Sequence, residues 1–408
     1  MTTTPKPEPD TLPVWARQDA FPQAPAGWGW VDMKGKTYPT DSLASLIKAI
    51  REDRDAGVSL VWLPGHSHMI LPEELDGAAD AVLAARKRLA SDDLNDAHDK
   101  LRWFGWLLAG LVVYRLYQGF AYAPQIATSA ERALFSIRSL IGSMSVGIAL
   151  LMFLIFAFIP WYQARKRIRE FSRWTDWDIA GVVPMLRFET WLDWQKSPVT
   201  RFMLGLVSLV GLAQLMPGNS LSAAGLVKGA YFQGEWWRLF TAPFMHGNLI
   251  HFLMNASAML YLGKRVEVFA RWPHVPMVFL FASCIGGEAS ARFVAASSVG
   301  ASGGLMGWLG FLLVFESLHG TLVPRRARRR LLAGVLLTGL IGLIGYRFID
   351  NAAHVGGLLA GMLYAAIVFP KSTSPLRPRS TVTDRIAGIA ALAVLVLSAL
   401  FAIRQILA

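Results

Sequence analysis

A polar motif interrupts an apolar part of the chain at His246-Gly-Asn-Leu-Ile-His251-Phe-Leu-Met-Asn255. His251 and Asn255 are four residues apart, so on a helix both side chains lie on one face and can donate hydrogen bonds toward one point. His246 comes five residues before His251, about 140° around a helix, and we expect it to cap the helix or anchor a loop. Hydrogen bonding between membrane helices is an alternative interpretation of the motif.

A serine stands in a second, glycine-rich motif, Gly300-Ala-Ser302-Gly303-Gly304-Leu-Met-Gly307. The glycines leave the backbone around the hydroxyl bare and allow close packing. We expect Ser302 at the start of a helix, where free N–H groups and the helix dipole favour a developing negative charge. A serine N-cap with a small-residue packing face is the alternative interpretation.

The third motif is Asp350-Asn351-Ala-Ala-His354-Val-Gly-Gly357-Leu-Leu-Ala-Gly361. His354, Gly357 and Gly361 share one helix face, and Gly-x-x-x-Gly is a motif for close helix contact. We expect this face to pack against the glycines of the serine motif, which would bring the imidazole near the hydroxyl. Taken alone, a histidine within a membrane can equally be a packed, hydrogen-bonding residue.

Together the three motifs contain the parts needed for acyl transfer. Ser302 needs a base to become nucleophilic, and His354 can serve. His251, Asn255 and the backbone N–H of Ser302 can supply donors for an oxyanion. Asp350 is four residues before His354 and could reach it, but we expect Asp350 at the membrane interface. The economical interpretation is therefore a Ser–His dyad.

The composition indicates that these motifs lie in a membrane protein. Of 408 residues 54% are hydrophobic and 17% charged, and the mean hydropathy is +0.39. These values exclude a disordered chain and argue against an ordinary soluble enzyme. Residues 1–102 carry 12 Lys and Arg against 16 Asp and Glu, whereas the remainder carries 28 against 12. This basic excess in an apolar region indicates membrane loops rather than nucleic-acid binding.

Nine apolar stretches are candidates for membrane helices, since a bilayer core needs roughly 20 residues in a helix. They lie at 103–122, 139–164, 202–216, 239–263, 275–293, 293–315, 331–345, 351–370 and 386–403. Loops rich in Lys and Arg alternate with loops that carry few; the rich ones are 161–201, 263–274, 319–330 and 370–385. The positive-inside rule then puts the N-terminus in the cytoplasm. The polar, Pro-rich start does not resemble a signal peptide.

Residues 1–102 are expected to form a small cytosolic α/β domain. Its expected elements are a strand at 58–63 and helices at 41–55 and 73–89. His66 and His68 flank Ser67 in a predicted turn, where two exposed loop histidines are favoured over a metal site. Residues 174–197, rich in tryptophan, are expected to form an amphipathic helix at the interface.

The motifs resemble those of the rhomboid family of intramembrane serine proteases. That family carries His-x4-His-x3-Asn in helix two of its core, Gly-x-Ser-Gly in helix four and Ala-His-x-x-Gly-x-x-x-Gly in helix six, with Trp-Arg in the first outer loop. The matching residues are His246, His251, Asn255, Gly300, Ser302, Gly303, Ala353, His354, Gly357, Gly361, Trp237 and Arg238. Many members have an aromatic residue four positions after the serine, where this chain has Met306.

The resemblance implies an all-α polytopic membrane protein with a six-helix rhomboid-like core at 202–370. Two further membrane helices and the interfacial segment would occupy 103–201, and one further helix would occupy 371–408. It also implies that Ser302 is the nucleophile and His354 the base, with His251, Asn255 and the Ser302 amide forming the oxyanion hole. Asn351, within the His354 motif, is expected to support the site.

The resemblance further implies cleavage of single-span or polytopic membrane-protein substrates near their outer ends. We expect no cofactor. We also expect no metal, since the histidine spacing differs from the His-Glu-x-x-His of zinc proteases. No nucleic-acid partner is expected, because the basic residues indicate membrane loops. With no organelle transit peptide visible, we expect the inner membrane of a bacterium.

Two alternatives remain open. A catalytically silent rhomboid-like protein would bind or escort membrane clients, and would be expected to lack the serine or the histidine. A transporter or channel would use the polar residues as a solute path and would show paired broken helices. Glu288 and Arg292, four residues apart, are expected to form an ion pair within one helix. The loop 218–245 is either a simple interfacial anchor or a route for substrate.

Overall fold

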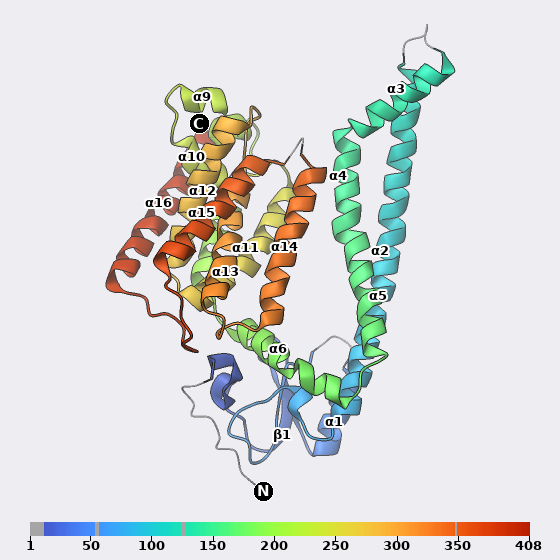
Figure 1. The fold of residues 1–408 in the computed structure, drawn as a ribbon, viewed down its shortest axis with the longest axis vertical. Helices are drawn as coiled ribbons and strands as arrows, with labels where there is room; N and C mark the ends of the chain where they lie inside the picture. The colour runs from blue at the N-terminus through green and yellow to red at the C-terminus, as the bar shows by residue number, and fades with distance from the viewer. Residues whose placement is uncertain (1–11, 54–56, 124–127, 347–348) are drawn as a thin grey trace. The chain divides into compact units, whose positions relative to one another are not determined.

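The structure is a computed structural model that describes residues 12–53, 57–123, 128–346 and 349–408. It divides into two compact units, which are treated separately below (Figure 1). One unit contains residues 18–187 and 339–349. The other contains 188–338 and 350–408 together with the first residues of the chain, and it carries all three polar motifs.

The first unit begins with a small α/β layer. Its antiparallel sheet has the strand order β2-β1-β3, and the strands are β1 (Trp28–Val31), β2 (Thr37–Thr40) and β3 (Leu60–Trp62). Helix α1 (Leu43–Glu52) packs on the sheet through Leu46 and Ile50, which are buried with Val61. The strand predicted at 58–63 and the helix predicted at 41–55 are thus observed, apart from residues 54–56, which lie outside the described part of the chain.

The helix predicted at 73–89 begins later than expected. Residues Pro72–Glu74 form a 3₁₀ turn, and α2 starts only at Ala79. Gly77 has a φ of +76°, a left-handed conformation that ends any regular helix at this point. From Ala79 the helix continues unbroken to Ala121, so the predicted cytosolic helix and the first predicted membrane span form one element of 43 residues.

The second predicted span lies in α4 (Met144–Phe153), a π-helical turn (Leu154–Phe158) and α5 (Ile159–Phe171). Before it lies α3 (Ser129–Ile141), which the sequence analysis did not predict although a Thr128/Glu131 capping box marks its start. Arg115 interrupts the apolar part of α2, and its guanidinium donates to Ser145 Oγ at 2.9 Å.

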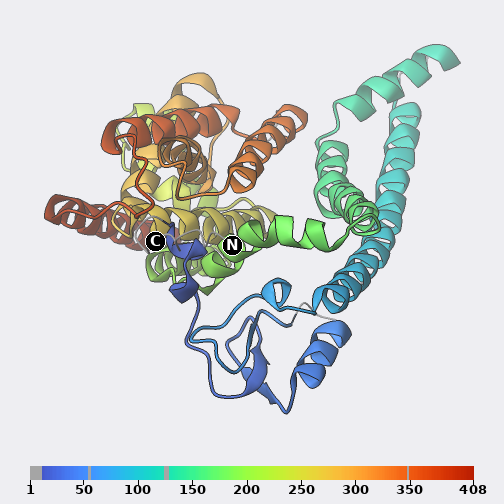
Figure 2. The same ribbon diagram turned by 60° about the horizontal axis from the view of Figure 1, so that its bottom comes forward.

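The second unit is a helical bundle. Its elements are α7 (Pro198–Ala213), the short helices α8 (Ser220–Ala224), α9 (Lys228–Phe232) and α10 (Arg238–Thr241), then α11 (Leu249–Ala270), α12 (His274–Phe293), α13 (Ser302–Leu318), α15 (Asn351–Val368) and α16 (Val382–Leu407). Helix α14 (Arg325–Ile344) belongs to this unit as far as Thr338. Helix α13 packs against α12 and α15. Helix α16, dark red, lies on the outside of this unit in both views (Figures 1 and 2).

Two of the predicted spans correspond to helices that begin later than expected. In each case the first residues of the predicted span lie outside the long helix. Before α11, a 3₁₀ turn that contains Pro243 ends at Phe244, and a loop follows. Before α13, Gly300 has a φ of +123°. Both breaks leave a polar motif at the start of a new helix rather than in the middle of one.

Membrane crossing is supported for several helices by their length and composition. Three described helical stretches are long and apolar enough to cross a bilayer, namely Ser145–Phe171, Asn351–Val368 and Val382–Leu407, while Pro198–Ala213 and Ser302–Leu318 are shorter apolar helices. The count of nine spans therefore stays a prediction.

The predicted interfacial helix at 174–197 corresponds to α6 (Asp176–Trp194). Its last part does not present its aromatic residues to a headgroup layer. Phe188 and Trp191, three residues apart on one face, are 0% and 3% exposed, and both ring systems pack on Phe269. The Trp191 indole is thus buried against Phe269, and the interfacial position of the segment 174–197 stays a prediction.

Candidate active site

The three polar motifs lie at the N-terminal ends of three helices of one unit. His251 and Asn255 occupy the first two turns of α11, where the side chain of the N-cap Asn248 accepts a hydrogen bond from the His251 amide at 2.9 Å. Ser302 is the first residue of α13, and His354 lies in the first turn of α15. Two sets of close backbone contacts bring these helix ends together.

The first contact joins α13 to α15. A methyl group added at Gly357 would overlap the carbonyl oxygen of Gly303, and one added at Gly361 would overlap that of Gly307. The predicted packing of the two glycine faces is therefore observed. Gly303 follows Ser302 directly, and the carbonyl oxygen of Ala353 lies 3.7 Å from the point where a Cβ of residue 303 would be. Ser302 and His354 thus lie in the first turns of α13 and α15, at the end where these two helices touch.

The second contact joins α11 to the loop before Ser302. A Cβ on Gly300 would lie 2.7 Å from Cε1 and 2.9 Å from Nε2 of His251, and 3.5 Å from Nδ2 of Asn255. The amide of Gly300 donates to the carbonyl of Ala242 at 2.9 Å, which fixes the loop in this position. Only a glycine allows the chain to pass so close to both side chains and to adopt a positive φ there.

Asn255 carries a donor that the surrounding protein does not use. The residue is 6% exposed, and its Nδ2 has no hydrogen-bond partner among the described residues. A buried amide without a hydrogen-bond partner lowers the stability of a protein. Such a group is therefore typical of a site where a bound ligand supplies the missing partner. Nδ2 lies close to Gly300, two residues before the serine hydroxyl.

Ser302 and His354 are both half-buried and so remain open to water or substrate. The N-cap of α13 is Ala301, which makes no side-chain capping bond, so the alternative of a serine N-cap is not observed. Within the described part of the chain, no hydrogen bond joins the Ser302 hydroxyl to the His354 ring. Such bonds are often long without substrate and tighten in the complex.

Asp350 is engaged by groups other than the His354 ring. Its Oδ1 accepts from the amide of Ala353 at 2.9 Å and so caps α15. Its Oδ2 accepts from Ser298 Oγ at 2.5 Å and from Ser290 Oγ. The carboxylate therefore fixes the start of the helix that carries the histidine, rather than binding the imidazole.

Lys228 extends this network, and the sequence analysis missed it. Its ammonium donates to Ser290 Oγ, and the lysine and the serine are 8% and 0% exposed. Burial lowers the pKa of the Lys228 ammonium, while the charge of Asp350 opposes this shift. No motif links residues 228, 290, 298 and 350, so only the fold could have revealed their contact.

Comparison with known proteins finds a matching domain. The family described as "Rhomboid domain" matches residues 233–371, the region that holds all three motifs. The chain contains a rhomboid domain. Together with its apolar helices, this domain indicates a multi-pass membrane protein.

Several relatives share this rhomboid domain. Over 145 residues the chain is 34% identical to Rhomboid protease GluP of Bacillus subtilis, covering 34% of this chain and 28% of that protein. It is 30% identical over 167 residues to RHOMBOID-like protein 4 of Arabidopsis thaliana, covering 41% and 40%. It is also 30% identical over 139 residues to human Inactive rhomboid protein 1, covering 33% and 16%. The matched regions thus span less than half of each relative.

His246 holds its place in the rhomboid domain through its backbone. Its amide donates to Gln214 Oε1 at 2.9 Å, and its carbonyl accepts from Gln214 Nε2 at 3.0 Å. The ring is buried and lies edge-on to the His251 ring, with 5.1 Å between the ring centroids. The backbone of His246 thus anchors this loop, while its ring packs beside the His251 ring.

Arg238 organises the loop before α11 in the rhomboid domain. The side chain is buried, and its Nη1 donates to the carbonyls of Gly225 at 2.7 Å and Ser222 at 2.9 Å. Its Nε donates to Glu235 at 2.6 Å, and the guanidinium lies over the Trp237 ring at 4.5 Å from the centroid. The Trp-Arg pair thus holds this loop together.

The other sequence predictions for this region can be compared with the structure. Glu288 and Arg292 form the predicted ion pair at 2.5 Å. Met306 is 9% exposed and fills a buried position after the serine. In the described ranges, no group of three His, Cys, Asp or Glu side chains is arranged to hold a metal ion.

Proposed function

We propose that this chain is an intramembrane serine endopeptidase. The observation that supports the proposal is that the helix ends that carry Ser302, His354 and the α11 side chains lie against one another. A nucleophile, a base and oxyanion donors held close together are the requirements of acyl transfer. The match to the rhomboid domain, and the name of the Bacillus subtilis relative, add independent support.

In the proposed mechanism, Ser302 Oγ attacks the scissile carbonyl while His354 accepts its proton. The resulting oxyanion accepts hydrogen bonds from Asn255, His251 and the Ser302 amide, and it lies near the positive end of the α13 dipole. His354 then protonates the leaving amine, which breaks the peptide bond and leaves an acyl-serine. Water, deprotonated by the same histidine, hydrolyses this ester and releases the second product.

The proposed substrates are transmembrane segments of single-span or polytopic membrane proteins. A peptide bond within an intact helix is shielded, so the substrate must unwind locally, and Gly or Pro near the cleavage point favours this. We propose that cleavage occurs near the outer membrane face, because the basic loops mark the other ends of the helices as cytoplasmic. The same rule supports a cytoplasmic N-terminus, and we propose the inner membrane of a bacterium as the location.

Reconstituted protein tests the proposal directly. Wild type, Ser302→Ala, His354→Ala and Ser317→Ala are incubated in vesicles with a model single-span substrate, and the product N-termini are sequenced. Ser317 is an exposed serine of the same helix, and it serves as the matched control. We expect cleavage and fluorophosphonate labelling in wild type and Ser317→Ala only. Equal cleavage by wild type and Ser302→Ala would refute the proposed nucleophile.

A client-binding protein without protease activity is the second candidate function. The observation that favours it is the 30% identity to a relative named Inactive rhomboid protein 1. This candidate predicts capture of membrane clients that is the same in wild type and in Ser302→Ala, with no cleavage and no labelling by either protein. The presence of both the serine and the histidine supports the protease.

A further inference from the structure

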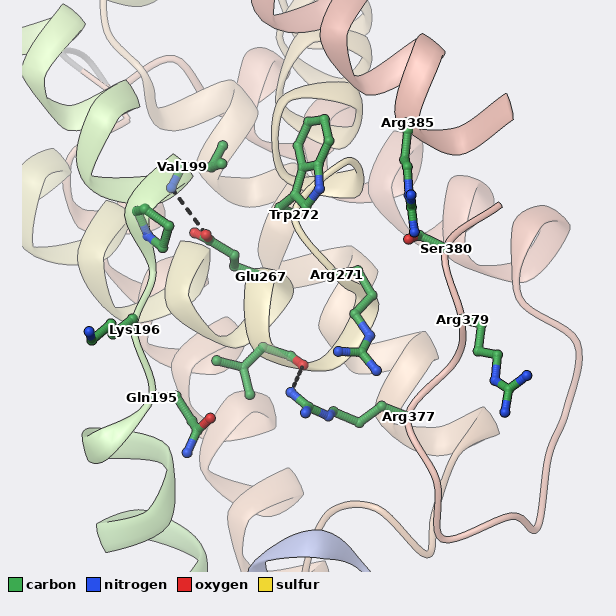
Figure 3. A pocket seen from close by; sticks show the side chains of 12 residues that line it. Gln195, Lys196, Val199, Glu267, Arg271, Trp272, Arg377, Arg379, Ser380 and Arg385 are labelled. Atoms are coloured by element: carbon green, nitrogen blue, oxygen red, sulfur yellow. Dashed lines mark hydrogen bonds between the residues drawn. The ribbon is translucent and has the colours of Figure 1, made fainter. Parts of the chain in front are cut away.

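A basic cavity lies at the other end of the rhomboid-domain helices from Ser302. Its volume is about 870 Å³. It is formed by the segment before α7, the end of α11 and the segment that leads into α16 (Figure 3). The lining residues used below are Lys196, Glu267, Arg271, Trp272, Arg377, Arg379 and Arg385.

The cationic groups of this cavity are not neutralised by the protein. Five lining side chains are cationic and one, Glu267, is anionic. Both carboxylate oxygens of Glu267 are occupied by α7, accepting from the Val199 amide at 3.0 Å and from Thr200 N and Oγ1 at 2.8 and 2.7 Å. Among the described residues, none of the five cations has a carboxylate within ion-pair distance. The cavity therefore carries more positive than negative charge, and none of its cations is paired with a carboxylate among the described residues.

Two of the guanidinium groups are held in fixed positions by the backbone. Nε of Arg271 donates to the Pro378 carbonyl at 3.2 Å, and Nη1 of Arg377 donates to the Val268 carbonyl at 3.1 Å. Figure 3 shows the two guanidinium groups beside each other. Each bond uses one donor, so further N–H groups of both side chains remain for a ligand. Burial and the neighbouring charge of Arg271 lower the pKa of Arg377.

The backbone at Arg271 is strained in a way that supports a functional role. Its φ of 78° and ψ of 157° fall in a region that is populated almost only by glycine. It is the one non-glycine residue with positive φ in the described ranges. Such strain persists where the surrounding structure imposes it, and it is concentrated at ligand clamps and active sites.

The position of the cavity favours a ligand from the membrane surface. The loop after helix α11, residues 263–274, is one of the basic loops that the positive-inside rule predicts at the cytoplasmic membrane surface. His251 and Asn255 lie at the N-terminal end of α11, whereas the cavity lies at its C-terminal end, beside this loop. Trp272 lines the cavity there, and indole rings favour the headgroup level.

We propose that this cavity binds a phosphate ester, and that its source is the headgroup of an anionic phospholipid. Guanidinium groups bind phosphate oxygens in a bidentate manner, and several of them around one cavity match a phosphate better than a single carboxylate. A bound headgroup would join the end of α11, the start of α7 and the segment before α16. A soluble phosphate compound has the same chemistry and is the alternative source.

Binding to the full-length purified protein tests this proposal. Phosphatidylglycerol and zwitterionic phosphatidylcholine are titrated in detergent and followed by native mass spectrometry. In parallel, inorganic phosphate is added at constant ionic strength and the melting temperature is measured. The test variant is Arg379→Gln/Arg385→Gln, in which both side chains are exposed, with Lys196→Gln as a second variant. The control Arg326→Gln/Arg329→Gln removes the same charge from exposed positions that do not line the cavity.

We expect phosphatidylglycerol to bind wild type and the control alike, and to bind the test variant about tenfold more weakly, since each lost surface cation weakens anionic-lipid binding. Lys196→Gln should show a smaller loss. Stabilisation by inorganic phosphate that is lost in the test variant, without a preference for phosphatidylglycerol, would support the site but assign it to a soluble ligand. Equal binding by wild type and test variant, or an equal loss in test and control variants, would overturn the proposal.

Discussion

At the residue scale, the proposed chemistry depends on a side chain that folds without making its full set of hydrogen bonds. Asn255 Nδ2 is buried without a partner among the described residues. An unpaired polar group destabilises a protein, so its presence beside Gly300 indicates that stability is lost here in favour of ligand binding. This pattern distinguishes the site from ordinary polar packing between membrane helices.

Removing the Asn255 donor should slow the chemical step. For Asn255→Ala we expect kcat to fall by about 10²-fold, the cost of one oxyanion donor in a soluble serine protease, with little change in KM. The measurement is steady-state cleavage of a model substrate in vesicles. Ser257→Ala, an exposed serine on the same helix, is the control. A wild-type kcat for Asn255→Ala would remove this residue from the oxyanion hole.

Lys228 should act through the position of α15 rather than on the substrate. In Lys228→Met the buried hydroxyl of Ser290 loses its donor, and the start of α15 loses support that reaches it through Asp350. We expect the protein to lose about 1–3 kcal/mol of stability and kcat to fall without a change in KM. Lys228→Arg should recover part of both losses. A free energy of unfolding equal to that of wild type in Lys228→Met, measured by denaturant unfolding, would show that the Lys228–Ser290–Asp350 network does not stabilise the fold.

At the element scale, contacts between helices decide whether the motifs meet. Gly357 and Gly361 let the backbone of α15 touch that of α13, and this contact was predictable from the spacing of the glycines. The breaks before α11 and α13 were harder to predict, because an apolar stretch without charges continues across both of them. Hydropathy therefore located the helices, while the N-cap Asn248 and the left-handed Gly300 mark where α11 and α13 begin.

A branched side chain at the glycine contact should separate α13 from α15. In Gly357→Val the added carbons would overlap the backbone of Gly303, which cannot move as a flexible side chain can. We expect loss of cleavage and a melting temperature lowered by several degrees. Gly205→Ala is the matched control, because a Cβ there meets nothing within 4 Å and alanine favours the helix. Wild-type activity in Gly357→Val would contradict the proposed placement of His354.

A buried ion pair joins α11 and α13 far from the reacting groups. Nη1 of Arg265 lies 3.4 Å from Glu316 Oε1, and the two side chains are 2% and 1% exposed. Losing one partner leaves an isolated buried charge, so we expect Glu316→Leu to cost about 3–5 kcal/mol. Arg265→Met/Glu316→Leu should be nearer to wild type in a double-mutant cycle by denaturant unfolding. Additive losses would show that the two charges do not interact.

At the scale of the whole molecule, the sequence predicts a membrane orientation as well as an architecture. The alternating basic loops predict a complete topology, and the number of spans stays a prediction because several described helices are short or carry charges. The α/β layer was predicted from short patterns at 41–55 and 58–63. The contact of Lys228 with Ser290 could not be predicted, since residues so far apart in sequence meet only through the fold.

Single cysteines can test the predicted topology. In a Cys284→Ser background, cysteines at the exposed positions Ser172, Thr321 and Ser374 should all react with a membrane-impermeant maleimide only after the cytoplasmic face is opened. A cysteine at the exposed Gln233, in the loop before α11, should react in intact cells. The cysteine-free parent gives the background signal. Labelling of Gln233→Cys and Thr321→Cys from the same side would contradict the predicted number of crossings between them.

The continuity of α2 has a mechanical consequence. Its 43 residues correspond to about 65 Å of uninterrupted helix. Its first turns pack against the sheet layer, where Ala81 and Val82 are buried, whereas its distal half bears solvent- or lipid-accessible rings such as Trp106. Because the helix has no break between these two parts, a tilt of the sheet layer would also displace the far end of α2.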